Sequence, residues 1–189
     1  MTAFTLNLDA VKLNDEQFYQ LCQDNHDLRL ELTSLGELIV MAPVGGESGN
    51  YEADNIIDVG NWNRRTQLGK VFSSSTVFKL PNGAQRSPDV AWIATARWEA
   101  LTPEQRRKFP PIAPDFVIEL RSATDSLSDL QSKMQEYLDN QVRLGWLIEP
   151  QNQQVEIYRL GQAKEVRLLP TMLSGEDVLP EFSLCVEAF

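Results

Sequence analysis

Two short apolar runs enclose a helical pattern in the stretch from Pro114 to Pro150. The runs cover residues 116–120 and 144–148, and residues 126–140 between them carry apolar side chains at helical spacing. A strand, a crossover helix and a second strand of the same sheet form a right-handed unit in which the two strands run parallel. We therefore expect this stretch to form the centre of an α/β fold.

Glu119 is a carboxylate inside the first apolar run. Because side chains alternate between the two faces of a strand, it shares a face with Asp115, Val117 and Arg121. Burying an unpaired carboxylate costs several kcal/mol, so Glu119 must be paired, bound to a metal ion or located at an exposed strand end. A structural ion pair with Arg121 and a functional role are therefore both open.

Lys133 lies in the helical pattern, at the flank of its apolar stripe. The stripe consists of Leu127, Leu130, Met134, Tyr137 and Leu138. From this position the lysine can lean over the sheet toward Glu119. The alternative is a lysine whose aliphatic stem covers the edge of the buried face while its ammonium group reaches solvent.

The other elements are expected on both sides of this unit. They are a helix beginning at Asn14, a hairpin of 28–33 and 37–41, a helix over about 49–68, strands at 71–72, 76–80 and 87–93, short helices within 97–108, a hairpin of 154–160 and 164–169, and a closing segment at 178–189. The order predicts an α/β fold with a mixed sheet flanked by helices. A length of 189 residues suits a single domain over residues 1–189.

The charged residues are unevenly distributed along the chain. A net charge of -10 argues against general binding of nucleic acids. Residues 64–108 nevertheless contain nine basic and three acidic residues. A basic face on an acidic body is compatible with binding a nucleic acid backbone at one place. Charges scattered over solvated loops and helix ends are the alternative.

Several chemistries lack the residues they need. His26 is the only histidine, which argues against a Ser-His-Asp or Cys-His nucleophile and against a histidine-rich zinc site. No glycine-rich motif of the GxGxxG or P-loop type is present, so no nucleotide cofactor is indicated. Cys22 and Cys185 have no CxxC partner. With no apolar run of membrane length and no signal-like amino terminus, the expectation is a cytoplasmic protein with reduced thiols and no membrane partner.

Asp89 follows a proline directly before another predicted strand. Taken alone, it is explained by turn chemistry. Together with Glu119, and with Lys133 and Arg121 nearby, it provides hard oxygen ligands of the kind that suit Mg²⁺ or Mn²⁺. An ion held there can activate water and neutralise charge on a phosphodiester.

The chain contains, in order, Pro-Asp-Val at 88–90, Asp-Phe-Val-Ile-Glu-Leu-Arg-Ser at 115–122, Lys133 with Tyr137, and Trp-Leu-Ile-Glu-Pro at 146–150. These motifs resemble the Uma2 family, also called DUF820, which is abundant in cyanobacteria and is assigned to the PD-(D/E)XK restriction-endonuclease-like superfamily. The resemblance covers nearly the whole chain, because residues 36–43 and the closing hairpin also fit. It implies a restriction-endonuclease-like core.

The resemblance also implies a role for each candidate residue. Asp89 and Glu119 would ligate the metal ion, and Lys133 would position or deprotonate the attacking water. Arg121 stands where the superfamily carries its lysine. Because arginine stays protonated in proteins, Arg121 is expected in the site but not as a general base.

A further acidic metal ligand is expected from the amino-terminal part of the chain. Glu37 is the first choice because it begins a predicted strand, with Glu47 and Glu52 as alternatives. The resulting hypothesis is a Mg²⁺- or Mn²⁺-dependent endonuclease that hydrolyses DNA and pairs as a homodimer. Two alternatives stay open: a nuclease-fold module without catalysis that serves in binding or assembly, and a nuclease directed at RNA or at nucleic acid junctions.

Overall fold

The computed structural model of the chain describes residues 4–8 and 10–189. Its helices are α1 (Asp15–Asp24), α2 (Gly46–Thr66), α3 (Thr95–Glu99), α4 (Pro103–Arg107) and α5 (Leu127–Asp139), with a 3-10 turn at Pro150–Asn152. Its strands are β1 (Phe4–Leu6), β2 (Arg29–Leu32), β3 (Leu38–Met41), β4 (Gly69–Ser73), β5 (Phe78–Lys79), β6 (Gln85–Arg86), β7 (Val90–Ala94), β8 (Phe116–Leu120), β9 (Leu144–Glu149), β10 (Gln154–Arg159), β11 (Glu165–Leu168), β12 (Thr171–Ser174) and β13 (Ser183–Val186).

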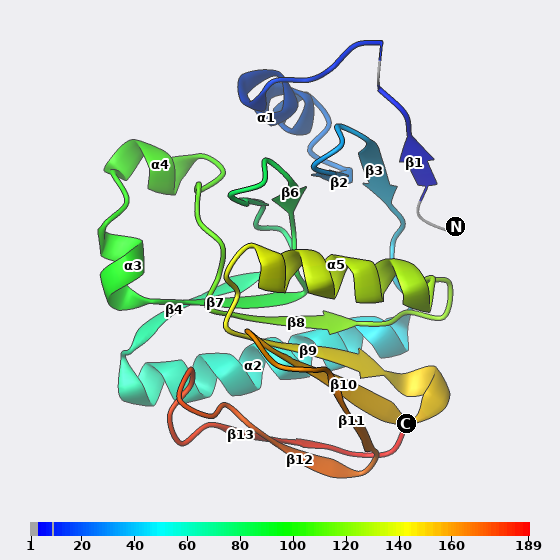
Figure 1. The fold of residues 1–189 in the computed structure, drawn as a ribbon, viewed down its shortest axis with the longest axis vertical. Coiled ribbons are helices and arrows are strands. Elements are labelled where there is room, and N and C mark those ends of the chain that lie inside the picture. Colours follow the sequence, from blue (N-terminus) through cyan, green and yellow to red (C-terminus); the bar gives the residue numbers. More distant parts are fainter. Residues whose placement is uncertain (1–3, 9) are drawn as a thin grey trace.

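The central layer is a six-stranded sheet in the order β11-β10-β9-β8-β7-β4. β8 and β9 are parallel and joined through α5, as the sequence predicts, and the other pairings in this sheet are antiparallel. A second sheet, β1-β3-β2-β6-β5, lies beyond α5, so that this helix is enclosed between the two sheets (Figure 1). The predicted mixed α/β fold, with helices on the sheet and hairpins at both ends of the chain, is confirmed.

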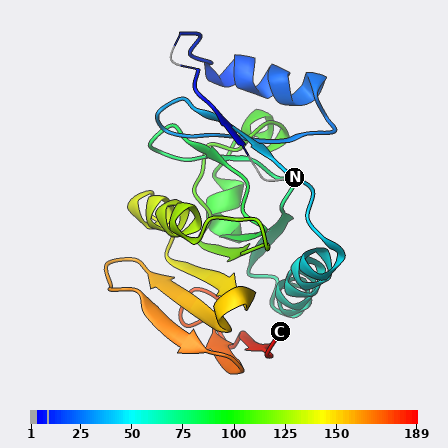
Figure 2. The ribbon, with the colours of Figure 1, turned by 90° about the vertical axis from the view of Figure 1, so that its right-hand side faces the viewer.

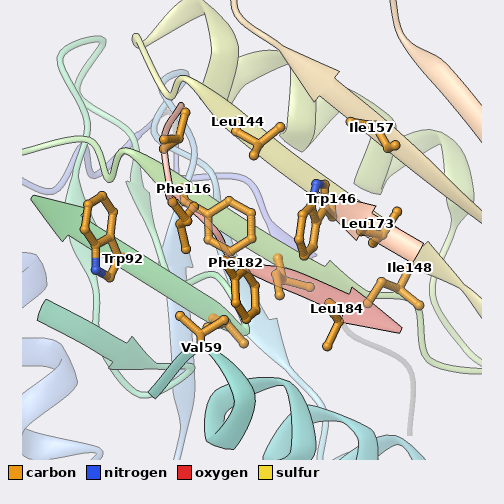
Figure 3. Close-up of a cluster of buried hydrophobic side chains, with 14 of the residues drawn as sticks. Val59, Trp92, Phe116, Leu144, Trp146, Ile148, Ile157, Leu173, Phe182 and Leu184 are labelled. Carbon is orange, nitrogen blue, oxygen red and sulfur yellow. The ribbon is translucent and has the colours of Figure 1, made fainter. Parts of the chain in front are cut away.

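The two faces of the central sheet have separate cores. One face packs against α2 and the β12–β13 hairpin, and its cluster includes Trp62, Phe116, Trp146 and Phe182 (Figure 3). The rings of Phe116 and Trp146 lie edge to face, 4.8 Å apart. Figure 2 shows α2 and α5 on opposite sides of the central strands. Phe116, Ile118 and Leu120 point to the α2 side, which leaves the intervening positions of β8 for the α5 side.

The α5 side carries the candidate residues. Met134 and Tyr137 of α5 pack against Val117 of β8. Gly145 of β9 permits a close approach, because a Cβ at this position would lie 2.5 Å from the Met134 side chain. Ser126 caps the helix by accepting a hydrogen bond from the Asp129 amide. This packing fixes α5 over the carboxyl end of β8.

Some boundaries differ from the sequence-based prediction. The strand expected at 87–93 begins only at Val90, because Pro88 has no amide hydrogen and the Ser87 amide donates to Glu31 instead of to a neighbouring strand. Helix α2 begins at Gly46, three residues before the expected start. The short strands β1, β6 and β12 were not predicted. No helix in the described ranges is long and apolar enough to cross a membrane.

Candidate active site

A pocket lies where the carboxyl end of β8 meets the loop between β3 and α2. Its charged lining residues are Arg29, Glu52, Asp89, Glu119, Asp125 and Lys133. Three of the four residues predicted to be catalytic, Asp89, Glu119 and Lys133, are therefore brought together. They come from three elements: the residue before β7, the strand β8 and the helix α5.

Glu119 is almost completely buried on the α5 side of the sheet. Lys133 Nζ lies 2.8 Å from its Oε1, and the Tyr137 hydroxyl donates a hydrogen bond of 2.9 Å to the same oxygen. Burial raises the pKa of Glu119 to about 7, and the nearby charges of Asp89 and Glu31 add to this rise, while Lys133 opposes it. The structural alternative, an ion pair between Glu119 and Arg121, is not formed.

Asp89 ends the segment that leads into β7, beside the end of β8. The Leu120 amide donates a hydrogen bond of 2.8 Å to Asp89 Oδ2, and Arg29 Nη2 lies 3.7 Å from Oδ1. Burial raises the pKa of Asp89 to about 6, against the opposing effect of the Leu120 amide and of Lys133. The charge of Glu52 contributes to the rise. The environment of Asp89 and Glu119 thus favours the neutral, protonated form of both carboxyl groups.

Lys133 bridges two carboxylates rather than reaching solvent. Its Nζ lies 2.9 Å from Glu31 Oε1 in addition to its contact with Glu119. Although burial disfavours the ammonium form, the two carboxylates raise the pKa of Lys133 above its ordinary value. The lysine is therefore a stable cation, and its three N–H donors are available to acceptors around it.

Glu31 was not predicted, although it is central to this network. It lies on β2 and accepts hydrogen bonds from the Ser87 amide at 2.8 Å and from Arg86 Nη1 at 3.1 Å, besides the contact with Lys133. Burial acts to raise the pKa of Glu31, but Lys133 and Arg86 outweigh it and hold the pKa below its ordinary range. Residues 28–33 alternate between apolar and polar side chains, a pattern typical of a strand with one solvent-exposed face. This pattern gives no indication that Glu31 is buried.

Arg121 does not join the pocket, contrary to the expectation from its place in the sequence. It follows the end of β8, and its guanidinium group forms an ion pair with Glu149, whose side chain is completely buried at the end of β9. Its Nε also donates to the Asp125 carbonyl at 3.2 Å. A buried carboxylate requires a counter-charge, and Arg121 supplies it to Glu149 instead of to Glu119.

Glu37 is likewise placed outside the pocket. It lies in the β2–β3 turn, where the Thr33 hydroxyl donates to its Oε2 at 3.3 Å and its own amide donates to Thr33 Oγ1 at 3.0 Å. Glu47 is exposed in the first turn of α2. Of the three acids considered from the sequence, Glu52 is the one that lines the pocket, and it accepts a hydrogen bond from the Ser74 hydroxyl.

A divalent ion such as Mg²⁺ requires oxygen ligands arranged around one point. Within the part of the chain that the structure describes, no group of three or more His, Cys, Asp and Glu side chains is arranged to hold a metal ion. Mg²⁺, however, is commonly held through one or two carboxylates, with water and substrate phosphate as the other ligands. Asp89 and Glu119 offer two such carboxylates at one pocket, each with a raised pKa that a nearby cation would lower. The residues present therefore fit a small, hard divalent ion.

The basic segment 64–108 is partly neutralised in the folded chain. Lys79 pairs with Asp15, Arg86 with Glu31 and Glu136, Arg97 with Asp115, and Lys108 with Glu16. Four of its nine basic side chains are thus engaged in ion pairs. A smaller positive surface remains than the count of basic residues suggests.

Comparisons with known proteins agree with the resemblance seen in the sequence. A family model described as "Uma2: Putative restriction endonuclease" matches residues 15–187. The fold is similar to the crystal structure of a "putative nuclease belonging to DUF820" from Anabaena variabilis ATCC 29413, with a TM-score of 0.69, 20% sequence identity, and coverage of 82% of this chain and 86% of that chain. No curated protein matches the chain. At this identity the likeness concerns the fold, and it confirms the nuclease-like fold expected from the sequence.

Proposed function

This chain belongs to the Uma2 family, and we propose that it is an endonuclease that hydrolyses phosphodiester bonds of DNA in the pocket of Asp89, Glu119 and Lys133. The observation that carries the proposal is the convergence of Asp89, Glu119 and Lys133 at one pocket, where burial raises the pKa values of the two carboxylates to about 6 and about 7. Strongly perturbed carboxylates in a pocket are typical of functional sites. The family description and the fold of the related nuclease support the same reaction class.

The proposed cofactor is Mg²⁺ or Mn²⁺, held by Asp89 and Glu119, with Glu52 as the further acid at the pocket. Such an ion, when bound, lowers the pKa of a water molecule and neutralises charge that develops on the phosphate. Hydrogen bonds from the protein orient both carboxylates: the Leu120 amide holds Asp89, and Tyr137 holds Glu119. Burial and the neighbouring carboxylates raise the pKa of Tyr137, so that its hydroxyl remains a donor.

Lys133 acts in this proposal as a positioning cation rather than as a base. Its pKa is raised by Glu119 and Glu31 despite burial, so an unprotonated amine is disfavoured at neutral pH. An ammonium group can donate hydrogen bonds to an attacking water molecule or to a phosphate oxygen, but it cannot accept a proton. Of the two roles implied by the family resemblance, positioning of the water is the one that this arrangement supports.

DNA is the proposed substrate, and a homodimer is the proposed assembly. The basic side chains of Arg64, Arg65 and Lys70 lie on β4, an edge strand of the central sheet, and at the end of α2 that is remote from the pocket, so they would contact the phosphate backbone away from the bond to be cleaved. The other edge strand, β11, exposes Val166 and Leu168 and offers a surface for pairing with a second copy. A molar mass of one chain in light scattering at working concentration would count against the dimer.

The direct test is a nuclease assay with supercoiled, linear and single-stranded DNA in the presence of Mg²⁺ or of a chelator. The proposal expects cleavage that requires the ion and that is abolished by Asp89→Asn. The matched control is Asp125→Asn, which alters another acid that lines the pocket and for which no role in catalysis is proposed. Cleavage of equal rate in the chelator, or in Asp89→Asn, would refute the proposed site.

A nuclease fold without catalysis is the second candidate, and one contact favours it. Lys133 and Tyr137 both engage Glu119 Oε1, so this carboxylate has partners in the absence of any ion. A binding module of this kind would retain DNA binding but show no cleavage with any of the DNA forms or divalent ions. The two candidates thus differ in the same assay.

A further inference from the structure

Arg29 has an unusual environment at the wall of the pocket. It is the first residue of β2, on the same strand as Glu31. Its Nε and Nη2 atoms are buried and have no hydrogen-bond partner among the described residues. The Asp89 carboxylate is 3.7 Å from Nη2, which is an electrostatic contact but is too long for a hydrogen bond.

Buried donors of a charged group are expensive to leave without acceptors. The other arginines around the site show the usual solution: Arg86 donates to Glu31 and Glu136, and Arg121 to Glu149 and to a backbone carbonyl. Arg29 differs because its guanidinium group has no such acceptor among the described residues, while its side chain lines the pocket that also contains Asp89 and Glu119. An acceptor that enters the pocket can therefore complete the hydrogen bonding of this guanidinium group.

The chemistry of the guanidinium group limits what that acceptor can be. Its planar fork matches two oxygens of a carboxylate or a phosphate, and it stays charged at any working pH. The pocket is already lined by four carboxylates, Glu52, Asp89, Glu119 and Asp125. A phosphodiester, whose oxygens could contact a bound cation and Arg29 at the same time, suits this mixed lining better than a free carboxylate does.

We propose that Arg29 is a substrate-binding residue whose guanidinium group donates hydrogen bonds to the non-bridging oxygens of the phosphate to be cleaved. The inference rests on the proposed nuclease function and adds to it a residue for which the sequence gave no indication. Arg29 would hold the phosphate on the side of the pocket formed by β2, beside Asp89, while Lys133 lines the same pocket from α5. The phosphate is thereby oriented relative to the water that attacks it.

A purely structural role, as a counter-ion to Asp89, predicts a different pattern of variants. Arg29→Lys keeps the positive charge near Asp89 but removes the two-pronged geometry. If Arg29 only balances the charge of Asp89, the lysine variant should behave like the wild type. If Arg29 binds the phosphate, Arg29→Lys should show a large part of the loss of activity that Arg29→Ala shows.

The test uses a fluorescent DNA duplex with the full chain, in two arms. Cleavage is followed in Mg²⁺, and binding is followed by anisotropy in Ca²⁺, which occupies oxygen-ligand sites and serves as the binding probe. Arg143→Ala is the control, because Arg143 is a half-exposed arginine paired with Asp177 at the opposite end of β9 from the pocket. Thermal melting of each variant checks that it is folded.

Arg29→Ala is expected to lower kcat/KM by about 10- to 100-fold, as expected for the loss of hydrogen bonds to a charged group. It should also weaken DNA binding in Ca²⁺ and reduce the dependence of the logarithm of affinity on the logarithm of salt concentration by about one. Arg29→Lys should retain the salt dependence but still lower kcat/KM at least about fivefold, given the difference between the two cations. Arg143→Ala should change both quantities less than about twofold.

Three results would overturn the inference: equal DNA affinity and equal kcat/KM for Arg29→Ala and Arg143→Ala, a wild-type kcat/KM in Arg29→Lys, or a wild-type protein that binds no DNA in Ca²⁺. The binding arm also separates this inference from the proposed function. A wild-type protein that cleaves nothing, but whose DNA binding is weakened selectively by Arg29→Ala, would refute the nuclease activity and support the role of Arg29.

Discussion

Glu31 and Glu119 are two buried carboxylates that contact the same ammonium group, yet their pKa values move in opposite directions. Lys133 Nζ lies 2.9 Å from Glu31 and 2.8 Å from Glu119. Glu31 also has Arg86 and the Ser87 amide, and its pKa is lowered in spite of burial. Glu119 has only a hydroxyl donor in addition to the lysine and faces Asp89, and its pKa is raised to about 7, chiefly by burial.

The difference separates the two carboxylates of one network into an ion that stabilises the fold and one that we propose to be functional. Glu31 is compensated by two cations and is stable in its charged form within the protein. Glu119 contacts Lys133, and Asp89 has Arg29 at 3.7 Å, but the pocket is lined by four carboxylates and only two cations, so that it retains an excess of negative charge. A divalent ion is the ligand that would remove this excess, which is why the pair on the pocket side is assigned to catalysis.

The largest expected effect is on cleavage by Glu119→Gln. This variant should lower kcat/KM by about 10³-fold or more, because metal-assisted stabilisation of a transition state contributes several kcal/mol. Its effect on stability at neutral pH should be smaller than that of Glu31→Gln, since burial raises the pKa of Glu119 to about 7 and part of this group is already neutral at that pH. Steady-state cleavage assays and thermal melts measure the two quantities. Cleavage by Glu119→Gln within tenfold of the wild type would contradict the proposed catalytic role of Glu119.

Glu31→Gln should act mainly on stability. It removes the carboxylate that compensates Lys133 and Arg86, and breaking a buried ion pair by removing one partner costs about 3 to 5 kcal/mol. Urea denaturation measures the free energy of unfolding. The control is Glu37→Gln in the neighbouring turn, which should cost less than about 0.5 kcal/mol, as is usual for a substitution outside the core. Equal stabilities of the two variants would show that Glu31 is not a structural ion.

The pH dependence of stability should separate the two carboxylates in the presence of a chelator. The ordinary pKa of Glu119 is 4.5 and its folded pKa is about 7. Between these values the folded chain keeps a proton that the unfolded chain releases, so this group's contribution to stability falls as pH rises, by on the order of 1 kcal/mol per pH unit. Denaturation of Glu119→Gln between pH 5 and pH 7 should show a smaller fall, which is confined to pH values below about 6, where the raised pKa of Asp89 makes its own contribution.

Glu31 has the opposite sign in the same experiment. Because its folded pKa is lowered, its contribution is present above the ordinary pKa and is lost as the pH falls through the folded value. The loss of stability at acid pH should therefore be smaller in Glu31→Gln than in the wild type. A wild-type curve that is parallel to those of both variants would contradict the pKa directions.

Arg121→Ala should have the smallest effect on catalysis. Its guanidinium group pairs with Glu149 outside the pocket, so kcat/KM is expected to change less than about threefold, as for a residue outside the site. Stability should nevertheless fall by about 1 to 3 kcal/mol, because Glu149 is completely buried and would lose its counter-charge. A loss of activity in folded Arg121→Ala would indicate that Arg121 acts in the active site.

Local patterns were sufficient to predict the centre of this fold. The period of two along 116–120 and the apolar stripe of α5 define which faces meet, and those faces carry Glu119 and Lys133. Asp89 joins them because the strand after it pairs with β8. These three residues could be assembled from the sequence because each lies next to a strongly patterned apolar segment.

The remaining partners depend on contacts that no local pattern specifies. Arg29 and Glu31 lie on the same face of β2, whose alternating sequence is typical of a strand with one solvent-exposed face, and the packing of the second sheet against α5 gives them their roles. Arg121 is drawn to Glu149 by the register of β8 and β9, in which Leu120 is opposite Ile148. The choice of Glu52 over Glu37 follows from how α2 is placed against the pocket.

The most direct test of the account is a calorimetric titration with Mn²⁺, which requires no knowledge of the substrate. The wild type is compared with Glu119→Gln and with Glu37→Gln, an acid that the sequence favoured as a ligand but that lies in the β2–β3 turn. The account predicts binding in the wild type and in Glu37→Gln, and loss of at least tenfold in affinity in Glu119→Gln. Equal Mn²⁺ affinity in Glu119→Gln and the wild type, or a loss confined to Glu37→Gln, would contradict the assignment of the metal to Asp89 and Glu119.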